Sequence, residues 1–206
     1  MSNTQKKGKL FVISGPAGSG KGTVMNILTQ RSDDYVLSVS LTSRPMLAGE
    51  TEGVNYYYVT RDQFESKISE GEVLEYTEYC GNYYGTPKTP AIRAIESGKH
   101  LLLEIEVDGA MQIKKVFPEA ILVMILPPNA NVQEYRLRTR GRDSEESIQK
   151  RLTRTREELK FAPQYDFIFL NEDGKAEAVA DAFELVAADE TDKVCDFHDS
   201  VSKYFD

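Results

Sequence analysis

The sequence predicts an α/β fold with a central parallel sheet flanked by helices. Short apolar runs alternate with helical patterns along most of the chain, and one of these runs leads directly into a glycine-rich loop. Alternating strands and helices are typical of units whose strands pair in parallel, with helices on both faces of the sheet. For 206 residues the natural organisation is one domain with an inserted or peripheral subdomain.

Five apolar runs are expected to form the strands of the main sheet. They are residues 10–14, 35–40, 100–106, 120–126 and 166–170. Between the second and third runs, residues 41–86 are rich in Tyr, Gly and Thr and contain alternating stretches at 55–59 and 73–79. Alternation indicates strands, so we expect a small mixed or antiparallel sheet inserted into the α/β core.

Local signals also place two helices and a tail. Thr60 and Gln63 fit a capping box that opens a helix ending near Gly71. The pair Thr86-Pro87 opens another helix, which a glycine at position 98 stops. The acidic tail, residues 189–206, ends in aromatic residues and forms either a docked helix or a frayed end.

The glycine-rich loop is the strongest functional signal. Residues 15–23 read G-P-A-G-S-G-K-G-T and fit the phosphate-binding pattern G-x-x-x-x-G-K. The glycines let backbone N–H groups turn inward around a β-phosphate, and Lys21 reaches the β and γ oxygens. A helix from Lys21 to about Arg31 presents its positive end to the same anion. The chain is therefore predicted to bind a nucleoside triphosphate.

The residue after the lysine departs from that pattern. The pattern places Ser or Thr there to hold Mg²⁺, whereas this chain has Gly22 and carries the hydroxyl one position later, at Thr23. We therefore expect the metal to be reached through water, with Thr23 as a second candidate ligand.

Residues 129–162 are strongly helical and rich in arginine. Arginines on a movable helical flap can neutralise the charge that a transferring phosphoryl group spreads over its oxygens. The pattern is equally typical of a solvated helix with ion pairs to nearby glutamates. Two of the arginines share a helix face at i, i+4, and Gly141 separates them from a second helical arm that Ser144 can cap. The arginines are Arg136, Arg138, Arg140, Arg142, Arg151, Arg154 and Arg156.

Composition limits the partners and the location. The chain is 40% hydrophobic and 28% charged, its longest apolar run is too short to span a bilayer, and its start lacks an apolar signal core. With only Cys80 and Cys195, no disulfide framework is implied. We expect a cytoplasmic protein without a membrane partner. The net charge of −8 disfavours a nucleic acid polymer as partner.

The ordered set of motifs resembles the guanylate kinase family over roughly residues 8–187. The matching pieces are 15–23, 38–44, 48–50 with Asn55-Tyr56, Glu75, 81–85, 103–109, 127–128, 136–141, 145–152 and 170–173. Any single piece is weak, but their order is specific. The resemblance implies an ATP-dependent nucleoside monophosphate kinase that uses Mg²⁺ and converts GMP or dGMP to the diphosphate in purine nucleotide metabolism.

The same resemblance implies an architecture and residue roles. A P-loop NTPase core (about 8–40, 87–128 and 163–188) would carry a GMP-binding insert (41–86) and a helical lid (129–162). The ATP site would comprise Gly15, Pro16, Ala17, Gly18, Ser19, Gly20, Lys21, Gly22, Thr23 and Asn171. The GMP site would comprise Ser40, Arg44, Tyr56, Glu75, Tyr84, Gly85, Thr86 and Glu106. Catalysis would rest on Lys21, Arg44, Arg136, Arg140 and Arg151, with Glu104 near the metal.

The chemistry of guanine fits this assignment. Guanine presents two adjacent donors, N1–H and the 2-amino group, which one carboxylate can accept together, whereas adenine has an acceptor at N1. Glu75 and Glu106 would supply such carboxylates. On its pattern alone, however, a single glutamate in a strand such as Glu75 is expected to face solvent.

The chain departs from the family at several positions. Leu47 stands where a second arginine usually binds the GMP phosphate, and Lys88 or Arg93 could fill that vacancy. Glu104 and Glu106 stand where aspartates are common, and Asp108 where glutamine is usual. Two alternatives stay open: a related kinase for another small phosphorylated acceptor, such as a ribose bisphosphate, and a non-catalytic binding module. The oligomeric state is also open, between monomer and homodimer.

Overall fold

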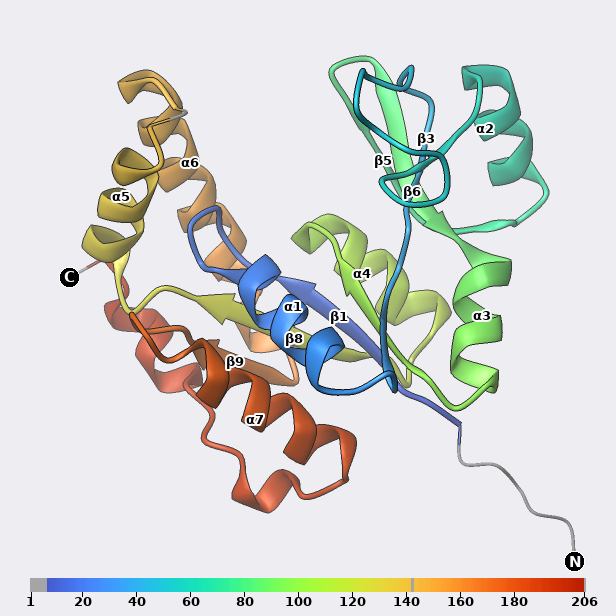
Figure 1. Cartoon of the computed structure of the whole chain (residues 1–206). Coiled ribbons are helices and arrows are strands. Elements are labelled where there is room, and N and C mark those ends of the chain that lie inside the picture. The colour runs from blue at the N-terminus through green and yellow to red at the C-terminus, as the bar shows by residue number, and fades with distance from the viewer. Residues whose placement is uncertain (1–6, 142, 206) are drawn as a thin grey trace, which may run out of the picture.

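The computed structural model describes residues 7–141 and 143–205. Its main sheet has five parallel strands in the order β2-β7-β1-β8-β9, which confirms the predicted fold class (Figure 1). The strands are β1 (Leu10–Ser14), β2 (Tyr35–Leu37), β7 (His100–Glu104), β8 (Ile121–Leu126) and β9 (Phe167–Leu170).

Two of these strands end earlier than predicted. β2 ends at Leu37 instead of residue 40, and β7 ends at Glu104 instead of residue 106. The backbone N–H of Ser38 still donates to Leu102 at 2.9 Å, but the chain then leaves toward a second sheet. After Glu104 it turns into a helix. The backbone N–H of Ile105 likewise still donates to Ile13 at 3.3 Å, and the chain leaves the sheet beyond it, at the carboxyl edge where ligands bind in open α/β sheets.

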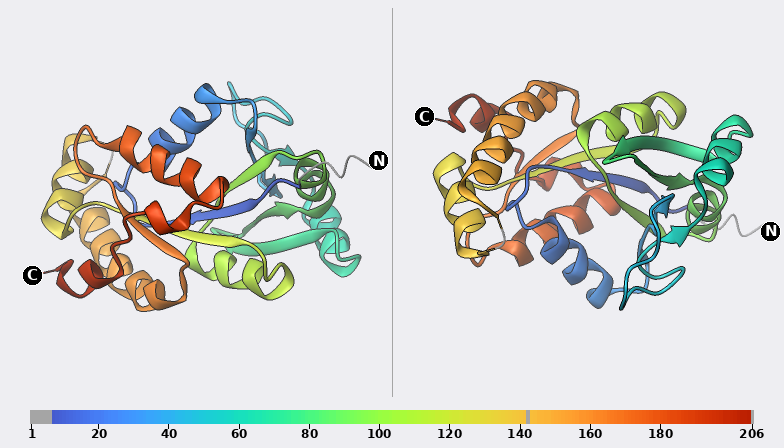
Figure 2. Two further views of the ribbon diagram at one scale, coloured as in Figure 1. Left: turned by 90° about the horizontal axis from the view of Figure 1, so that it is seen from below. Right: turned by 90° about the horizontal axis from the view of Figure 1, so that it is seen from above.

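Helices cover both faces of the main sheet. The helices α1 (Lys21–Arg31) and α7 (Ala176–Ala187) pack on one face, and α3 (Lys88–Glu96) and α4 (Val107–Val116) lie on the other. Figure 2 shows α7 and α4 on opposite sides of the strands. The strands are apolar throughout because both faces are buried, and this rigid layer positions the loops at its edge.

The second sheet lies outside this core. It has the strand order β4-β3-β6-β5, with β3 and β4 parallel and the other pairs antiparallel. Its elements are β3 (Leu41–Thr42), β4 (Tyr57–Tyr58), α2 (Arg61–Ser69), β5 (Val73–Tyr79) and β6 (Asn82–Pro87). The capping box of Thr60 and Gln63 is confirmed. Thr86 and Pro87 are the last residues of β6, which still pairs with β5 there, and the predicted helix opens directly after them, with Pro87 as the N-cap of α3.

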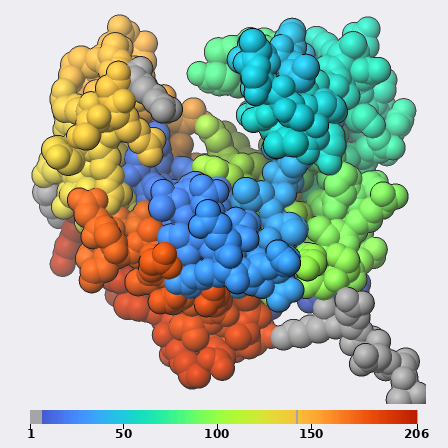
Figure 3. Space-filling view, in the orientation of Figure 1, coloured from blue at the N-terminus to red at the C-terminus, as the bar shows by residue number. Residues whose placement is uncertain are grey.

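The arginine-rich segment forms two helices, α5 (Ala130–Thr139) and α6 (Glu145–Glu158), followed by the 3-10 helix η1 (Leu159–Gln164). Ser144 caps α6 as predicted, and Gly141 has a φ of 64° in the turn between the helices. Arg142 lies outside the described residues. Figure 3 shows this helical arm and the second sheet standing apart above the main sheet, with a hollow between them. Across the ranges described, no helix is long and apolar enough to cross a membrane.

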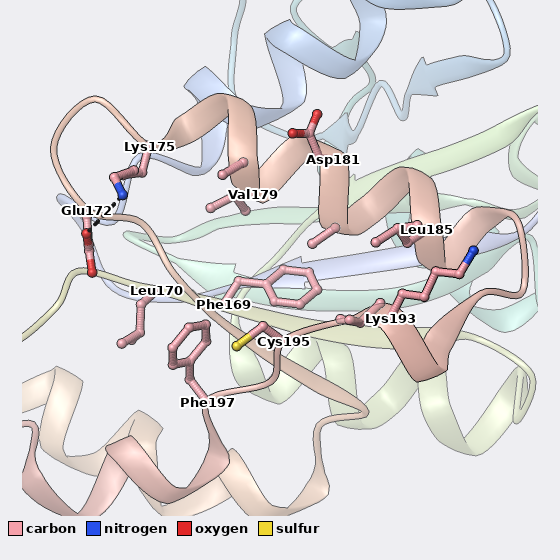
Figure 4. A pocket seen from close by; sticks show the side chains of 13 residues that line it. Phe169, Leu170, Glu172, Lys175, Val179, Asp181, Leu185, Lys193, Cys195 and Phe197 are labelled. Carbon is pink, nitrogen blue, oxygen red and sulfur yellow. Dashed lines mark ion pairs between the residues drawn. The ribbon is translucent and has the colours of Figure 1, made fainter.

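The tail is docked, not frayed. Its two 3-10 helices are η2 (Thr191–Lys193) and η3 (His198–Lys203). Between them, Cys195 and Phe197 lie against β9 and α7 and line a shallow groove of about 290 Å³ (Figure 4). The backbone N–H of Phe197 donates to Ile168 of β9 at 3.0 Å. The tail is therefore tied to the edge of the main sheet.

Candidate active site

The phosphate-binding loop connects β1 to α1 at the carboxyl edge of the sheet. Gly15, Gly18 and Gly20 have φ values of 142°, 90° and 84°, which L residues rarely adopt. A Cβ on Gly15 would lie 2.1 Å from the backbone oxygen of Ile125. Glycine is therefore needed for the loop to pass close to β8 and to turn into the helix.

Lys21 lies over this loop. Its Nζ donates to the backbone oxygen of Gly15 at 2.7 Å and of Pro16 at 3.3 Å, and lies 3.7 Å from Glu104. Burial lowers the pKa of Lys21, and the nearby Glu104 carboxylate opposes that shift. Because its partners among the described residues are loop carbonyls and one carboxylate, the cation can exchange them for the oxygens of a phosphate.

A cavity of about 500 Å³ lies between the second sheet and the main sheet. We call it the acceptor cavity. Its walls bring together side chains that are far apart in the sequence, including most of the predicted GMP site: Ser40, Tyr56, Glu75, Tyr84, Gly85 and Glu106. Asp108 and Arg154 also contribute to its lining.

Glu75 is a buried carboxylate in this cavity. It is 4% exposed, so the expectation of an outward-facing strand residue was wrong. Its Oε1 accepts a hydrogen bond from Thr86 Oγ1 at 2.6 Å. Its Oε2 lies where a Cβ on Gly109 of α4 would approach to 2.8 Å, so α4 packs close to the carboxylate because position 109 is glycine. Burial raises the pKa of Glu75, partly opposed by the Thr86 hydrogen bond.

Arg44 lies beside the acceptor cavity, against the ring of Tyr56. Its guanidinium carbon is 5.5 Å from that ring centroid and 5.8 Å from that of Tyr58. Its Nη2 donates to Glu50 Oε1 at 2.7 Å, and this hydrogen bond lowers the pKa of Glu50 to about 2. The other oxygen of Glu50 accepts from the backbone N–H of Leu47 at 2.8 Å. Glu50 thus links Arg44 to the backbone of Leu47, and the Arg44 guanidinium faces the rings of Tyr56 and Tyr58.

In the part of the chain that the structure describes, neither candidate cation of α3 replaces the arginine that is missing at position 47. The Leu47 side chain is 59% exposed. Within the described chain, neither Lys88 nor Arg93 lines the acceptor cavity, and both are exposed. The cation that does line it is Arg154 of α6, which forms an ion pair with Glu106.

A second cavity of about 400 Å³ adjoins the acceptor cavity and contains the phosphate-binding loop. We call it the phosphate pocket. The two cavities share Tyr56, Glu104, Ile105, Glu106 and Arg154 in their linings, so they adjoin one another. Lys21, Arg151 and Glu158 also line the phosphate pocket. The acceptor cavity is therefore next to the pocket that contains Lys21.

A third cavity of about 390 Å³ lies on the other side of the loop. Arg136 and Arg140 line it together with Asn171 and Thr23. Arg136 donates to the backbone oxygen of Gly18 at 3.1 Å and to that of Asn171 at 2.8 Å. The Asn171 amide donates to the backbone oxygen of Ser19 at 2.8 Å. The predicted arginines therefore lie in two places. Arg136 and Arg140 line this third cavity, whereas Arg151 lines the phosphate pocket, on the acceptor side of the loop.

Arg154 and Glu158 are charged residues of the site that were not in the predicted set. Arg154 Nε donates to Glu158 Oε1 at 3.0 Å, and burial raises the pKa of Glu158. Arg151, Arg154 and Glu158 recur at i, i+3 and i+7, which places them on one helix face. That spacing is the signal in the sequence that could have identified them.

The donor set suits Mg²⁺ held jointly with a substrate. Glu104 is half exposed in the phosphate pocket beside Lys21. Among the described residues, no group of three or more acidic, His or Cys side chains could hold a metal alone. Mg²⁺ typically keeps several waters and is bound through one or two carboxylates plus substrate phosphates. Thr23 lines a different cavity from Glu104, so the two predicted ligands lie on opposite sides of the loop.

The fold and the site define the class of the protein, an ATP-dependent nucleoside monophosphate kinase built on a P-loop core. The family model described as guanylate kinase matches residues 7–188, and the chain belongs to that family. It is 48% identical to a guanylate kinase of Synechocystis sp. over 170 residues, which are 82% of this chain and 89% of that protein. A guanylate kinase of Clostridioides difficile is 40% identical over 200 residues, 97% of each chain. The crystal structure of a guanylate kinase from Anaplasma phagocytophilum superimposes with a TM-score of 0.68 at 29% identity, covering 94% of this chain and 91% of that one.

Proposed function

We propose that this chain transfers the γ-phosphoryl group of ATP reversibly to GMP or dGMP, forming ADP and the guanosine diphosphate. The observation that carries the proposal is the buried carboxylate of Glu75 in a cavity that adjoins the pocket of the phosphate-binding loop. Ser40 and Glu106 line the same cavity and offer it further acceptor oxygens. Guanine can satisfy these acceptors with N1–H and its 2-amino group, whereas adenine would leave them unpaired.

The acceptor phosphate would lie at the junction of the two cavities. Tyr56 lines both cavities, and Arg44 and Tyr84 lie near its ring, with the Tyr56 and Tyr84 ring centroids 5.9 Å apart. An arginine and two phenol groups offer charge and hydrogen bonds to a phosphate. From there an acceptor oxygen can attack the γ-phosphorus, forming the new P–O bond while the bond to the β-phosphate bridging oxygen breaks and ADP leaves with the electron pair.

The ATP phosphates would bind to the backbone of residues 15–22, with Lys21 on their β and γ oxygens. Arg136, Arg140 and Asn171 surround the third cavity, which we assign to the nucleoside end of ATP. Glu104 would hold Mg²⁺ through water, and Thr23 remains a second candidate. When bound, the metal would neutralise charge on the β- and γ-phosphates. Positioning and charge neutralisation by these side chains would supply most of the rate acceleration.

We propose that α5 and α6 act as a lid over the phosphates. The Arg151 side chain is held by Asp143 of the same arm at 3.1 Å, so it has a resting partner to exchange for phosphate. Arg154 likewise rests on Glu106, one of the proposed guanine acceptors. Binding of GMP would take Glu106 from Arg154 and leave this arginine free to face the phosphates. Closure would exclude water and limit ATP hydrolysis.

A coupled assay of ADP release across GMP, dGMP, AMP, UMP and ribose bisphosphates tests the function. We expect GMP and dGMP to be the preferred acceptors. AMP turnover equal to that of GMP would refute the guanine assignment. A preference for ribose bisphosphates would favour the related kinase, and no ADP release with any acceptor would favour the non-catalytic module. Cytoplasmic location stays a prediction.

A further inference from the structure

Gln133 of α5 is a buried polar side chain outside the site described so far. It is 0% exposed, and its amide makes three hydrogen bonds. Nε2 donates to the backbone oxygen of Ala17 at 3.2 Å and to Thr155 Oγ1 at 2.9 Å, while Oε1 accepts from the Tyr204 hydroxyl at 3.1 Å. Because a carbonyl oxygen only accepts, Ala17 determines which end of the amide faces the loop and leaves Oε1 for Tyr204.

Two of these partners belong to the wall of the phosphate pocket. Ala17 and Thr155 both line that pocket. The Thr155 hydroxyl donates in turn to the backbone oxygen of Arg151 at 2.9 Å, and Arg151 lines the pocket as well. Gln133 therefore connects the phosphate-binding loop to the part of α6 that carries a proposed catalytic arginine.

The third partner brings the C-terminal tail into this network. Tyr204 is 2% exposed, and its backbone oxygen accepts from the N–H of Ala130 at 2.9 Å. The ring of Phe205 lies 3.8 Å from the guanidinium carbon of Arg156. Further back, Asp196 Oδ1 accepts from the N–H of Ile168 in β9 at 2.7 Å. The tail is thus fastened to the main sheet at one end and to both lid helices at the other.

We propose that Gln133 and Tyr204 are positioning residues for phosphoryl transfer, with the tail holding Gln133 so that it sets the phosphate-binding loop against α6. A buried amide with three partners has one favoured orientation. Removing the Tyr204 hydroxyl would leave Oε1 unpaired, and the amide would shift or rotate away from Ala17 and Thr155. Phosphoryl transfer tolerates little displacement of the groups around the phosphate, so the rate should fall. The kinetic part of this inference rests on the proposed function.

The test compares Tyr204→Phe with the matched control Tyr35→Phe in the full chain. Tyr35 is also a buried tyrosine, but it lies on β2, at the opposite edge of the main sheet from β9. We expect Tyr204→Phe to lower kcat about fivefold, the effect of one neutral hydrogen bond, with KM for GMP changed by less than about twofold. Tyr35→Phe should leave kcat unchanged. A Tyr204→Phe protein with a lower Tm but an unchanged kcat would overturn the proposal, because the tail would then be structural only.

A double-mutant cycle separates an effect through Gln133 from an independent one. Gln133→Met keeps similar volume and removes the amide. If Tyr204 acts through Gln133, adding Tyr204→Phe to Gln133→Met should lower kcat no further. An equal loss in both backgrounds would overturn the proposed route.

Hydrogen exchange of ligand-free protein provides a readout that needs no substrate. Amides of residues 15–20 should exchange faster in Tyr204→Phe than in the wild type and in Tyr35→Phe. Unchanged exchange there would overturn the coupling between tail and loop. Because this measurement involves no acceptor, its failure is distinguishable from a failure of wild-type protein to phosphorylate GMP.

Discussion

Replacing Glu75 with glutamine changes the acceptor cavity by a single atom, because one carboxylate oxygen becomes an amide NH₂. The amide oxygen can keep the 2.6 Å hydrogen bond from Thr86. The NH₂ group then takes the place of Oε2, beside Gly109 of α4, in the wall of the acceptor cavity that both residues line. In the proposed complex this donor meets guanine N1–H, which is also a donor.

The expected loss follows from the bond that is removed. A hydrogen bond to a charged group contributes about 1.5–3 kcal/mol, and here the replacement also opposes two donors. We therefore expect kcat/KM for GMP to fall by about 2–3 kcal/mol, or about 30- to 150-fold. AMP carries no donor at N1, so its weak turnover should fall much less or even rise.

The raised pKa of Glu75 adds a pH signature. Because burial raises the pKa in the folded state, the folded chain holds this proton at pH values where the unfolded chain has lost it. Ligand-free stability therefore falls as pH rises from the ordinary carboxyl pKa through the raised one. A glutamine at position 75 does not titrate, so this loss of stability does not occur in Glu75→Gln. The variant should therefore match or exceed the wild-type Tm at neutral pH. KM for GMP in the wild type should rise as pH falls through the raised pKa.

Steady-state kinetics with GMP and AMP, and calorimetry on the same preparations, measure both effects. Glu65→Gln is the matched control, because Glu65 is an exposed carboxylate on α2 of the same sheet region. It should leave kcat/KM for GMP unchanged. If Glu75→Gln retains wild-type kcat/KM for GMP while folding normally, the carboxylate does not bind the base.

The remaining predictions concern the phosphates. Lys21→Ala should abolish transfer, at least about 1,000-fold by the scale of lost transition-state charge stabilisation, without unfolding the protein; near-wild-type turnover in a normally melting variant would contradict the loop assignment. Leu47→Arg should lower KM for GMP about tenfold by adding a charge-assisted contact, because Glu50 ties the backbone of residue 47 to Arg44. Lys88→Ala should not change KM, because Lys88 is exposed on α3. The opposite pair of results would show that Lys88 compensates. Hydrogen exchange across residues 129–141 and 143–162 should slow much more with a bisubstrate analogue than with GMP, and equal exchange in both would contradict a lid that closes on both substrates.

Structural features were predicted most accurately from the sequence where the signal comes from residues that are close together in the chain. The apolar run, the glycines and Lys21 lie within fifteen residues, and the structure places β1, the loop and α1 at the predicted positions. The capping box at Thr60 is local in the same sense. The ends of β2 and β7 were harder to predict. The topology determines where the chain leaves the sheet, and the pattern of apolar residues does not change at that point.

The missed features depend on contacts between distant segments. Alternation in β5 could not show that Glu75 is buried, because Gly109 of α4 covers it from another part of the chain. The docked tail is a stronger case, since Tyr204 meets Gln133 across 71 positions. A buried glutamine on a charged helix gives no sign in the sequence of its partners. The ordered motifs placed these segments in one family, but the hydrogen-bond partners required the structure.

The central claim is that a guanine-reading cavity and an ATP-binding loop form one continuous site. Equilibrium binding of two bisubstrate analogues tests it most directly: adenosine joined to guanosine through five phosphates, and the matching compound with two adenosines. We predict that the mixed compound binds about 100-fold tighter or more, because only guanine pairs with the buried acceptors around Glu75. Equal dissociation constants for the two compounds would contradict the claim.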